Sequence, residues 1–157
     1  MIPGRPTLVL AVLLLAVGGG AIHPFGTVKQ DARAPLLSSA AIEAANLERI
    51  QRSCASCHSD RVQRPWYGYV APTSWLVEKD VHQARAQLNF SHWPSYSAQE
   101  RITLLSAIDA VLRTNAMPPQ RYTALHRDAV LSDSERQALY DWTKTERRRL
   151  RALSPEN

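Results

Sequence analysis

Residues 54–58 read Cys54-Ala55-Ser56-Cys57-His58, and they contain both cysteines of the 157-residue chain. Positions i, i+3 and i+4 of a helix share one face, so Cys54, Cys57 and His58 project from the same side of one turn. Two thiols followed directly by an imidazole are the attachment signature of a c-type haem. Chance produces this pattern about once in 2,500 sequences that have only two cysteines. We therefore predict one covalent haem c, bound by Cys54 and Cys57, with His58 ligating its iron.

Three other uses of the two cysteines are weaker. A thioredoxin-like redox pair requires a βαβ context, which the sequence around residue 54 does not show. Structural zinc requires a fourth ligand besides His58, and no second cysteine pair supplies one. A disulfide between cysteines three apart in a helix has poor geometry. Haem attachment remains the favoured interpretation.

The second iron ligand is predicted by elimination. Methionine occurs only at Met1 and Met117, and Met1 begins the N-terminal apolar segment. Pro118 and Pro119 stiffen the loop that follows Met117, because the proline ring fixes φ. We predict Met117 as the sixth ligand, the alternative being a methionine that fills a gap in the core.

Other side chains are candidates for the surroundings of the haem. The rival sixth ligands are His82, which lies on the polar side of a predicted helix, and His92 and His126, which lie in predicted loops. A carbonyl near Pro65 or Pro72 is the expected acceptor for the second ring N–H of His58. Arg61 or Arg64 suits a haem propionate, because a guanidinium binds a carboxylate with two hydrogen bonds.

Length and charge limit the partners. With 157 residues and 45% apolar content, the chain is long enough for one compact domain. The net charge is +5, but the basic residues are spread along the chain except for Arg147, Arg148, Arg149 and Arg151. This run is typical of a solvated helix end, and no nucleic-acid-binding motif accompanies it. We therefore expect a redox partner protein and no nucleic acid, since charge steers docking between electron carriers.

The N-terminus has the pattern of an export segment. Arg5 precedes an apolar run from Leu8 to Val17, and small residues follow it at positions 18–21. The run suits a signal peptide, and extended through Ile22 it reaches the lower limit for a membrane anchor. Both alternatives place the domain in the periplasm, either anchored to the inner membrane or secreted after cleavage. We assign 1–22 to this segment, 23–37 to a linker and 38–157 to the haem-binding domain.

The remaining pattern is helical. Apolar spacing predicts one helix from about Ser39 into the cysteine motif and another from Thr73 to Leu88. Two capping boxes predict the starts of a third helix at Ser97 and a fourth at Ser132. No strand pattern competes with them. The predicted fold class is all-α, with the helices packed around one haem.

This order of parts resembles the small mono-haem cytochromes c: a helix that enters the cysteine motif, a methionine loop and a closing helix. Residues 45 to 145 are similar to the bacterial haem-binding domain family with a Cys-x-x-Cys-His-Ser start. The matching stretches are Cys54 to Ser59, Pro65-Trp66-Tyr67, Ala71 to Val77, Leu88 to Trp93, and Met117-Pro118-Pro119 with Tyr122, His126 and Trp142 beyond. The resemblance implies an exported, all-α, c-type haem protein. Asp60 departs from the pattern, which has an amide after the serine.

The predicted function is one-electron transfer rather than catalysis, because iron held by His58 and Met117 has no open position. One alternative is a haem-based sensor or peroxidase-like protein in which Met117 leaves the sixth position open. Another is an interaction module in which the haem is mainly structural.

Overall fold

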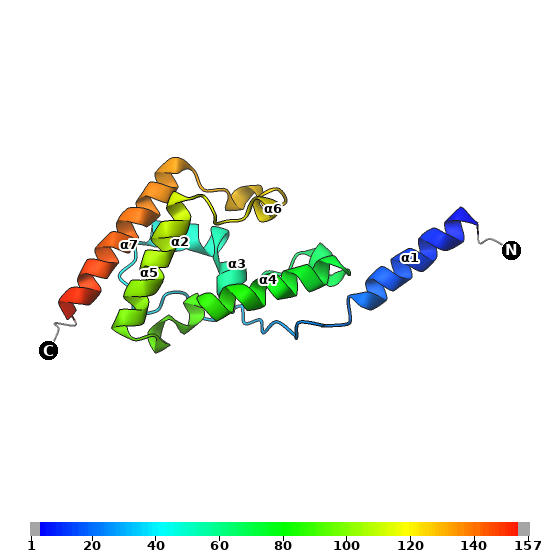
Figure 1. Cartoon of the computed structure of the whole chain (residues 1–157), viewed down its shortest axis with the longest axis horizontal. Helices are drawn as coiled ribbons and strands as arrows, with labels where there is room; N and C mark the ends of the chain where they lie inside the picture. The colour runs from blue at the N-terminus through cyan, green and yellow to red at the C-terminus, as the bar shows by residue number, and fades with distance from the viewer. Residues whose placement is uncertain (1–3, 154–157) are drawn as a thin grey trace.

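The computed structural model describes residues 4–153 and is all-α over that range, as the sequence predicts. The elements in chain order are α1 (Arg5–Gly19), α2 (Ala44–Ser53), α3 (Ala55–His58), η1 (Trp66–Tyr69), α4 (Thr73–Gln87), η2 (Phe90–Ser95), α5 (Ala98–Arg113), α6 (Gln120–Thr123), η3 (Arg127–Ala129) and α7 (Asp133–Leu153). Those labelled η are short 3₁₀ helices. Figure 1 shows α1 extending away from the body that the other elements form.

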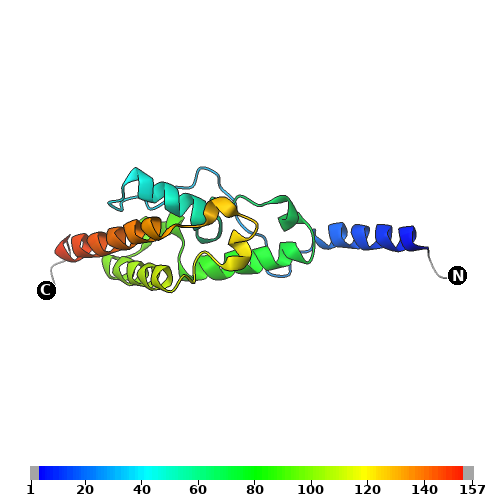
Figure 2. The ribbon, with the colours of Figure 1, turned by 90° about the horizontal axis from the view of Figure 1, so that it is seen from above.

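The helices α5 and α7 form the main packed pair of the body. They run antiparallel and lie side by side in both Figure 1 and Figure 2. Leu105 of α5 and Leu139 of α7 are buried in one apolar core, which also takes in Ile50 of α2 and the fully buried Trp93 of η2. Removing these side chains from water is the main stabilising contribution to the fold.

Both predicted capping boxes are present. The Ser97 hydroxyl accepts a hydrogen bond from the Glu100 amide, and the Glu100 carboxylate accepts one from the Ser97 amide. Ser132 and Glu135 make the same two bonds before α7. Each box satisfies amide groups that a helix start leaves unpaired, so these two helix starts follow from a few local residues.

The first predicted helix differs from the structure at its start. It begins at Ala44 rather than near Ser39, because Leu37 and Ser39 have φ angles of 51° and 72°. These angles lie in the left-handed region and are incompatible with a right-handed helix. The helix is also interrupted at Cys54, whose φ of −128° separates α2 from α3. The cysteine motif therefore occupies its own short turn, which packs against α4.

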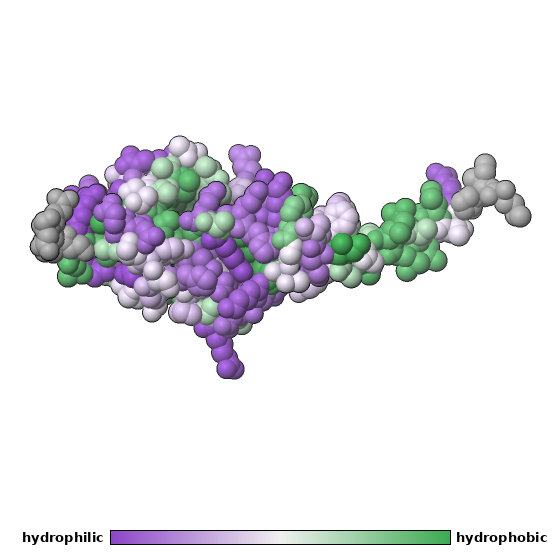
Figure 3. All heavy atoms as spheres, turned by 60° about the horizontal axis from the view of Figure 1, so that its bottom comes forward, coloured by the Kyte–Doolittle hydropathy of each residue, from purple (hydrophilic) through white to green (hydrophobic). Residues whose placement is uncertain are grey.

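The N-terminal helix α1 projects its side chains into solvent, and none of them is buried. Figure 3 shows it as an apolar rod beside a domain surface of mixed polarity. No helix within residues 4–153 combines the length and the apolar character needed to cross a membrane. The predicted anchor is therefore not supported by this helix.

The segment between α1 and α2 runs along the domain. His23 Nδ1 lies 2.6 Å from a carboxylate oxygen of the fully buried Glu78, and the Asp31 amide donates to the Asp60 carbonyl at 2.8 Å. Part of the predicted linker therefore contacts α4 and the residues that follow the cysteine motif.

Candidate functional site

The cysteine motif forms one tight turn. The amides of Cys57 and His58 both donate to the Cys54 carbonyl, at 3.2 and 3.0 Å. This turn has the spacing that places the three side chains on one side of the backbone. The two thiols are free rather than joined in a disulfide. The local geometry therefore leaves both sulfurs available for attachment.

The His58 ring is oriented by a main-chain acceptor. Its Nδ1–H donates to the Leu88 carbonyl at 3.2 Å, and its ring centroid lies 6.1 Å from that of Phe90. Burial lowers the pKa of His58, while hydrogen bonds that the ring donates to the Leu88 and Ala84 carbonyls act against the shift. The ring is therefore neutral at pH 7, and with the proton on Nδ1 it keeps a lone pair on Nε2. This is the state in which an imidazole ligates iron.

The expectation of an acceptor near Pro65 or Pro72 is wrong. Leu88 is the C-cap residue directly after α4, where the carbonyls have no partner within the helix. Pro65 and Pro72 instead precede the starts of η1 and α4. The end of the helical pattern near residue 88 signals free carbonyls there, but it does not say that His58 donates to one of them.

The two thiols lie in different electrostatic surroundings. Burial raises the pKa of Cys54 to about 12, with a smaller contribution from Cys57. Burial also raises the pKa of Cys57, and the Asp80 carboxylate adds to the shift, while Arg121 and Arg85 oppose it. Both thiols are therefore protonated at neutral pH, and Cys57 lies within reach of charges from α4 and α6.

Met117 lies in the connection between α5 and α6, and its side chain is 36% exposed. Four residues later, Arg121 forms an ion pair with Asp80 of α4 at 2.9 Å. This ion pair holds the segment after Met117 against α4, the helix on which the turn of the cysteine motif packs. The assignment of Met117 as an iron ligand stays a prediction.

The three rival histidines lie in different places. His82 bonds to the Gly26 carbonyl at 3.2 Å, and His92 lies 3.4 Å from the Asp60 carboxylate with a largely exposed side chain. His126 contacts residues around the motif: its Nε2 lies 2.6 Å from the Tyr67 hydroxyl, and its ring stacks on Tyr122 at 4.2 Å.

Both tyrosines connect His126 to the motif. Tyr67 and Tyr122 both lie close enough to Cys57 for a thiolate there to raise their pKa values, and Ser56, the residue before Cys57, lowers the pKa of Tyr122. Burial raises the pKa of each phenol, so both carry their protons at neutral pH. His126 is therefore the rival histidine whose contacts lead to the cysteine motif.

A cleft of about 630 Å³ adjoins the motif. This volume is within the range of small-molecule and cofactor sites, about 300–1,000 Å³. Its walls include Ala55, Ser56, Arg61, Arg64, Tyr122 and His126. The cleft is therefore lined both by the two residues between the cysteines and by the two arginines that are candidates to bind a propionate.

Arg64 provides a test of whether a haem fits. Its Nη2 lies 3.4 Å from Glu78, but its buried Nε has no hydrogen-bond partner in the part of the chain that is described. A buried N–H without a partner costs free energy, and a carboxylate is a suitable acceptor for it. Together with two free thiols and a neutral imidazole, this donor fits a haem that carries propionates.

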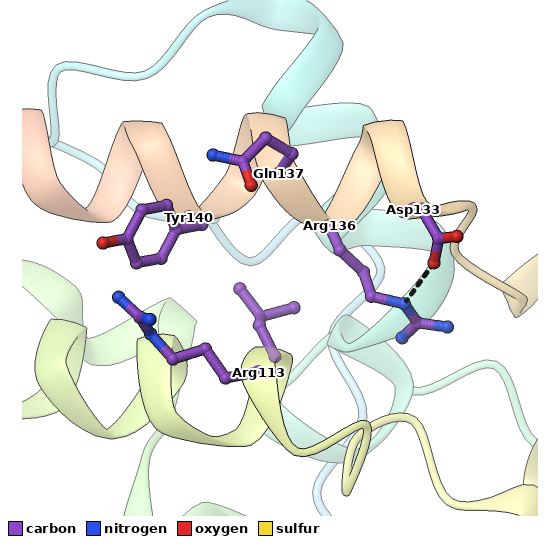
Figure 4. A pocket seen from close by; sticks show the side chains of 6 residues that line it. Arg113, Asp133, Arg136, Gln137 and Tyr140 are labelled. Carbon is purple, nitrogen blue, oxygen red and sulfur yellow. Dashed lines mark ion pairs between the residues drawn. The ribbon is translucent and has the colours of Figure 1, made fainter.

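A second hollow has none of these features. It measures about 190 Å³ and lies between α5 and α7. Figure 4 shows the Arg113 and Tyr140 side chains pointing toward each other, with the guanidinium 4.2 Å from the ring centroid. No cysteine, histidine or methionine lines it. Within residues 4–153, no three His, Cys, Asp or Glu side chains are grouped to bind a metal ion.

Comparisons with known proteins indicate haem binding. The chain is 27% identical over 100 residues to the cytochrome c peroxidase Ccp of Escherichia coli (strain K12). That match covers 62% of this chain and 22% of the peroxidase, so the chain spans only a small part of that relative. No solved structure matches. The haem-binding domain family matches residues 17–145, which is most of the chain and includes the cysteine motif and Met117. The chain belongs to the haem-binding domain family.

Proposed function

We propose that the protein is an exported, mono-haem, c-type cytochrome that transfers single electrons. In this proposal the haem is attached to Cys54 and Cys57, and its iron is ligated by His58 and Met117. The observation that carries the proposal is the turn at residues 54–58. There two free thiols accompany a neutral imidazole whose Nδ1–H is already bonded to the Leu88 carbonyl.

The chain's own residues would do four things. Cys54 and Cys57 would hold the haem through thioether bonds, so that it cannot dissociate. His58 would present Nε2 to the iron, since Leu88 occupies the other ring nitrogen. Arg64 would pair its buried Nε with a propionate. Met117, as the second iron ligand, would raise the potential of the one-electron couple that the haem supplies when bound.

Export and partner choice are part of the same proposal. The apolar run of α1 preceded by Arg5 supports a signal segment that directs the domain to the periplasm. The net charge of +5 favours an acidic surface on the redox partner, because opposite charges steer association.

A second candidate function is a peroxidase-like or ligand-sensing protein with an open sixth position. The match to the E. coli peroxidase favours it. His126 gives it a physical basis, because this histidine contacts Tyr67 and Tyr122 beside the motif and offers a polar group near an open position. The two candidates therefore differ in whether Met117 closes the iron site.

The test compares visible spectra and carbon monoxide binding in the wild type, Met117→Ala and His126→Ala. A closed His/Met carrier binds carbon monoxide slowly or not at all when reduced. Met117→Ala then lowers the potential and opens the site to carbon monoxide, whereas His126→Ala leaves both properties close to those of the wild type. Rapid binding by the wild type, with no spectral change in Met117→Ala, would instead support the open-site candidate.

A further inference from the structure

The peptide group between Leu88 and Asn89 is hydrogen-bonded at both ends. Its carbonyl accepts from Nδ1 of His58 at 3.2 Å, and its N–H donates to the hydroxyl of Tyr96 at 3.0 Å. Carbonyl and N–H belong to one rigid plane, because the peptide bond has partial double-bond character. A displacement of the N–H end therefore displaces the carbonyl that orients His58.

Tyr96 is held firmly enough to fix that end. Its amide donates to the Trp93 carbonyl at 3.3 Å, and its ring packs edge-on against the Trp93 ring at 6.2 Å. Trp93 is fully buried, and Tyr96 packs against the same apolar core. The hydroxyl therefore occupies a position set by the core of the domain.

The Asn89 side chain ties the same peptide to the motif from another direction. Its Nδ2 donates to Asp60 at 3.0 Å, and its Oδ1 accepts from the Ser91 amide at 2.9 Å. The Asp60 amide in turn donates to the Ser91 hydroxyl at 3.1 Å. All three residues are buried, so water does not compete for these bonds. Asp60, the residue that departs from the family pattern, thus links the chain after His58 to the segment after Leu88.

We infer that Tyr96 is a positioning residue for His58 and acts through the Leu88–Asn89 peptide. The inference rests on the proposed function, in which His58 ligates the haem iron. A hydrogen bond accepted from the peptide N–H polarises the group and makes its carbonyl a stronger acceptor. A stronger acceptor at Nδ1 makes the imidazole a better electron donor to the metal. Tyr96 therefore lowers the reduction potential without touching the haem.

The test uses Tyr96→Phe in the haem-loaded protein, because this change removes one oxygen and keeps the ring. We expect the reduction potential to rise. We also expect hydrogen exchange of two N–H groups, measured by NMR in the reduced state, to accelerate by about tenfold or more. The Asn89 amide loses its acceptor, the Tyr96 hydroxyl, and the His58 Nδ1–H keeps only a weakened hydrogen bond to the Leu88 carbonyl. Tyr140→Phe removes a hydroxyl between α5 and α7 and should leave all three quantities unchanged.

A second variant separates positioning from general loosening. Trp93→Phe weakens the core around Tyr96 but keeps the hydroxyl, so it should lower stability with a smaller change in potential than Tyr96→Phe. An unchanged potential and unchanged exchange in Tyr96→Phe would overturn the inference, as would an equal shift in Trp93→Phe. A wild type without covalent haem would overturn the proposed function instead, while Asn89 exchange would still decide whether Tyr96 holds the peptide.

Discussion

Nη2 of Arg121 lies 2.9 and 3.0 Å from the two carboxylate oxygens of Asp80, so this pair joins the segment after Met117 to α4. Both charges act on Cys57, which places the pair within electrostatic reach of the motif. The Met117 loop is therefore attached to α4 by a contact at the protein surface, where the Arg121 side chain is 73% exposed.

Arg121→Ala should speed access to the iron with little effect on the fold. An exposed ion pair contributes less than about 1 kcal/mol to the free energy of unfolding. Its loss nevertheless frees the loop that bears the proposed sixth ligand, so cyanide should bind the oxidised protein faster than it binds the wild type. Stopped-flow spectroscopy measures the rate. The control is Arg113→Ala, which removes an ion pair with Asp109 of α5 and a contact with Tyr140 of α7 but no contact with α4. Equal cyanide-binding rates in the two variants would contradict the role of the Arg121 contact.

Leu105→Ala should destabilise the domain by about 2–5 kcal/mol, the usual cost of a cavity in place of a buried leucine. Leu105 is fully buried in the core between α5 and α7. Leu125→Ala is the matched control, because that leucine is exposed and its truncation should change stability by about 0.5 kcal/mol or less. Denaturant unfolding of the two variants checks the difference. An equal loss of unfolding free energy in the two variants would contradict the burial of Leu105 in the core.

Glu135→Ala should cost more stability than Glu100→Ala. Both glutamates complete a capping box, but Glu135 also accepts a hydrogen bond from Arg52 and so joins α7 to α2. A helix cap contributes about 1 kcal/mol, and the contact with Arg52 adds to it. Thermal unfolding of the two variants measures the difference. A larger loss in Glu100→Ala would argue against the link between α2 and α7.

The contribution of Glu135 should depend on pH. The Ser132 amide, helped by Arg52, holds the pKa of this carboxyl below its ordinary value of 4.5. A lowered pKa in the folded state means that the stabilisation is complete above the unfolded value and is lost as pH falls through the folded one. The stability deficit of Glu135→Gln should therefore be constant between about pH 7 and 5 and shrink below about pH 4. Chemical denaturation across this range gives the profile, and a deficit that grows on acidification would contradict it.

The N-terminal segment should direct export. Residues 1 to 30 fused to a reporter that is active only outside the cytoplasm should carry it across the inner membrane, because Arg5 and the apolar run form a signal pattern. Replacing Leu13 and Leu14 with aspartate supplies the matched control, since charge in the apolar run should abolish export. A reporter retained in the cytoplasm with the natural segment would contradict the proposed location.

The sequence predicted those structural features that depend only on residues close together in the chain, namely two helix starts and the turn of the cysteine motif. The pairs Ser97 with Glu100 and Ser132 with Glu135 mark two helix starts, because each box closes within four residues. The spacing of Cys54, Cys57 and His58 predicts their turn for the same reason. The left-handed φ at Leu37 was beyond such reasoning, because leucine rarely adopts that conformation and nothing in its neighbours signals it.

Contacts between distant residues could not be predicted. His58 donates to the Leu88 carbonyl, 30 residues away in the sequence, and the Tyr96 hydroxyl accepts from the next peptide N–H. Both contacts depend on how α4 and η2 pack against the motif. The basic run near the C-terminus is a similar case. There Arg147 donates to Ser106 of α5 at 3.1 Å, so part of a run that was expected to be solvated contacts the neighbouring helix. Such contacts depend on how helices pack, which helical periodicity alone does not specify.

Intact-mass spectrometry of protein made in cells with the complete c-type maturation machinery tests the central claim most directly. The account predicts that the wild-type mass exceeds that of the polypeptide by one haem, which stays bound under denaturing conditions. Replacing both Cys54 and Cys57 with alanine should leave no covalently bound haem. A wild-type chain recovered under these conditions as bare polypeptide would contradict the account.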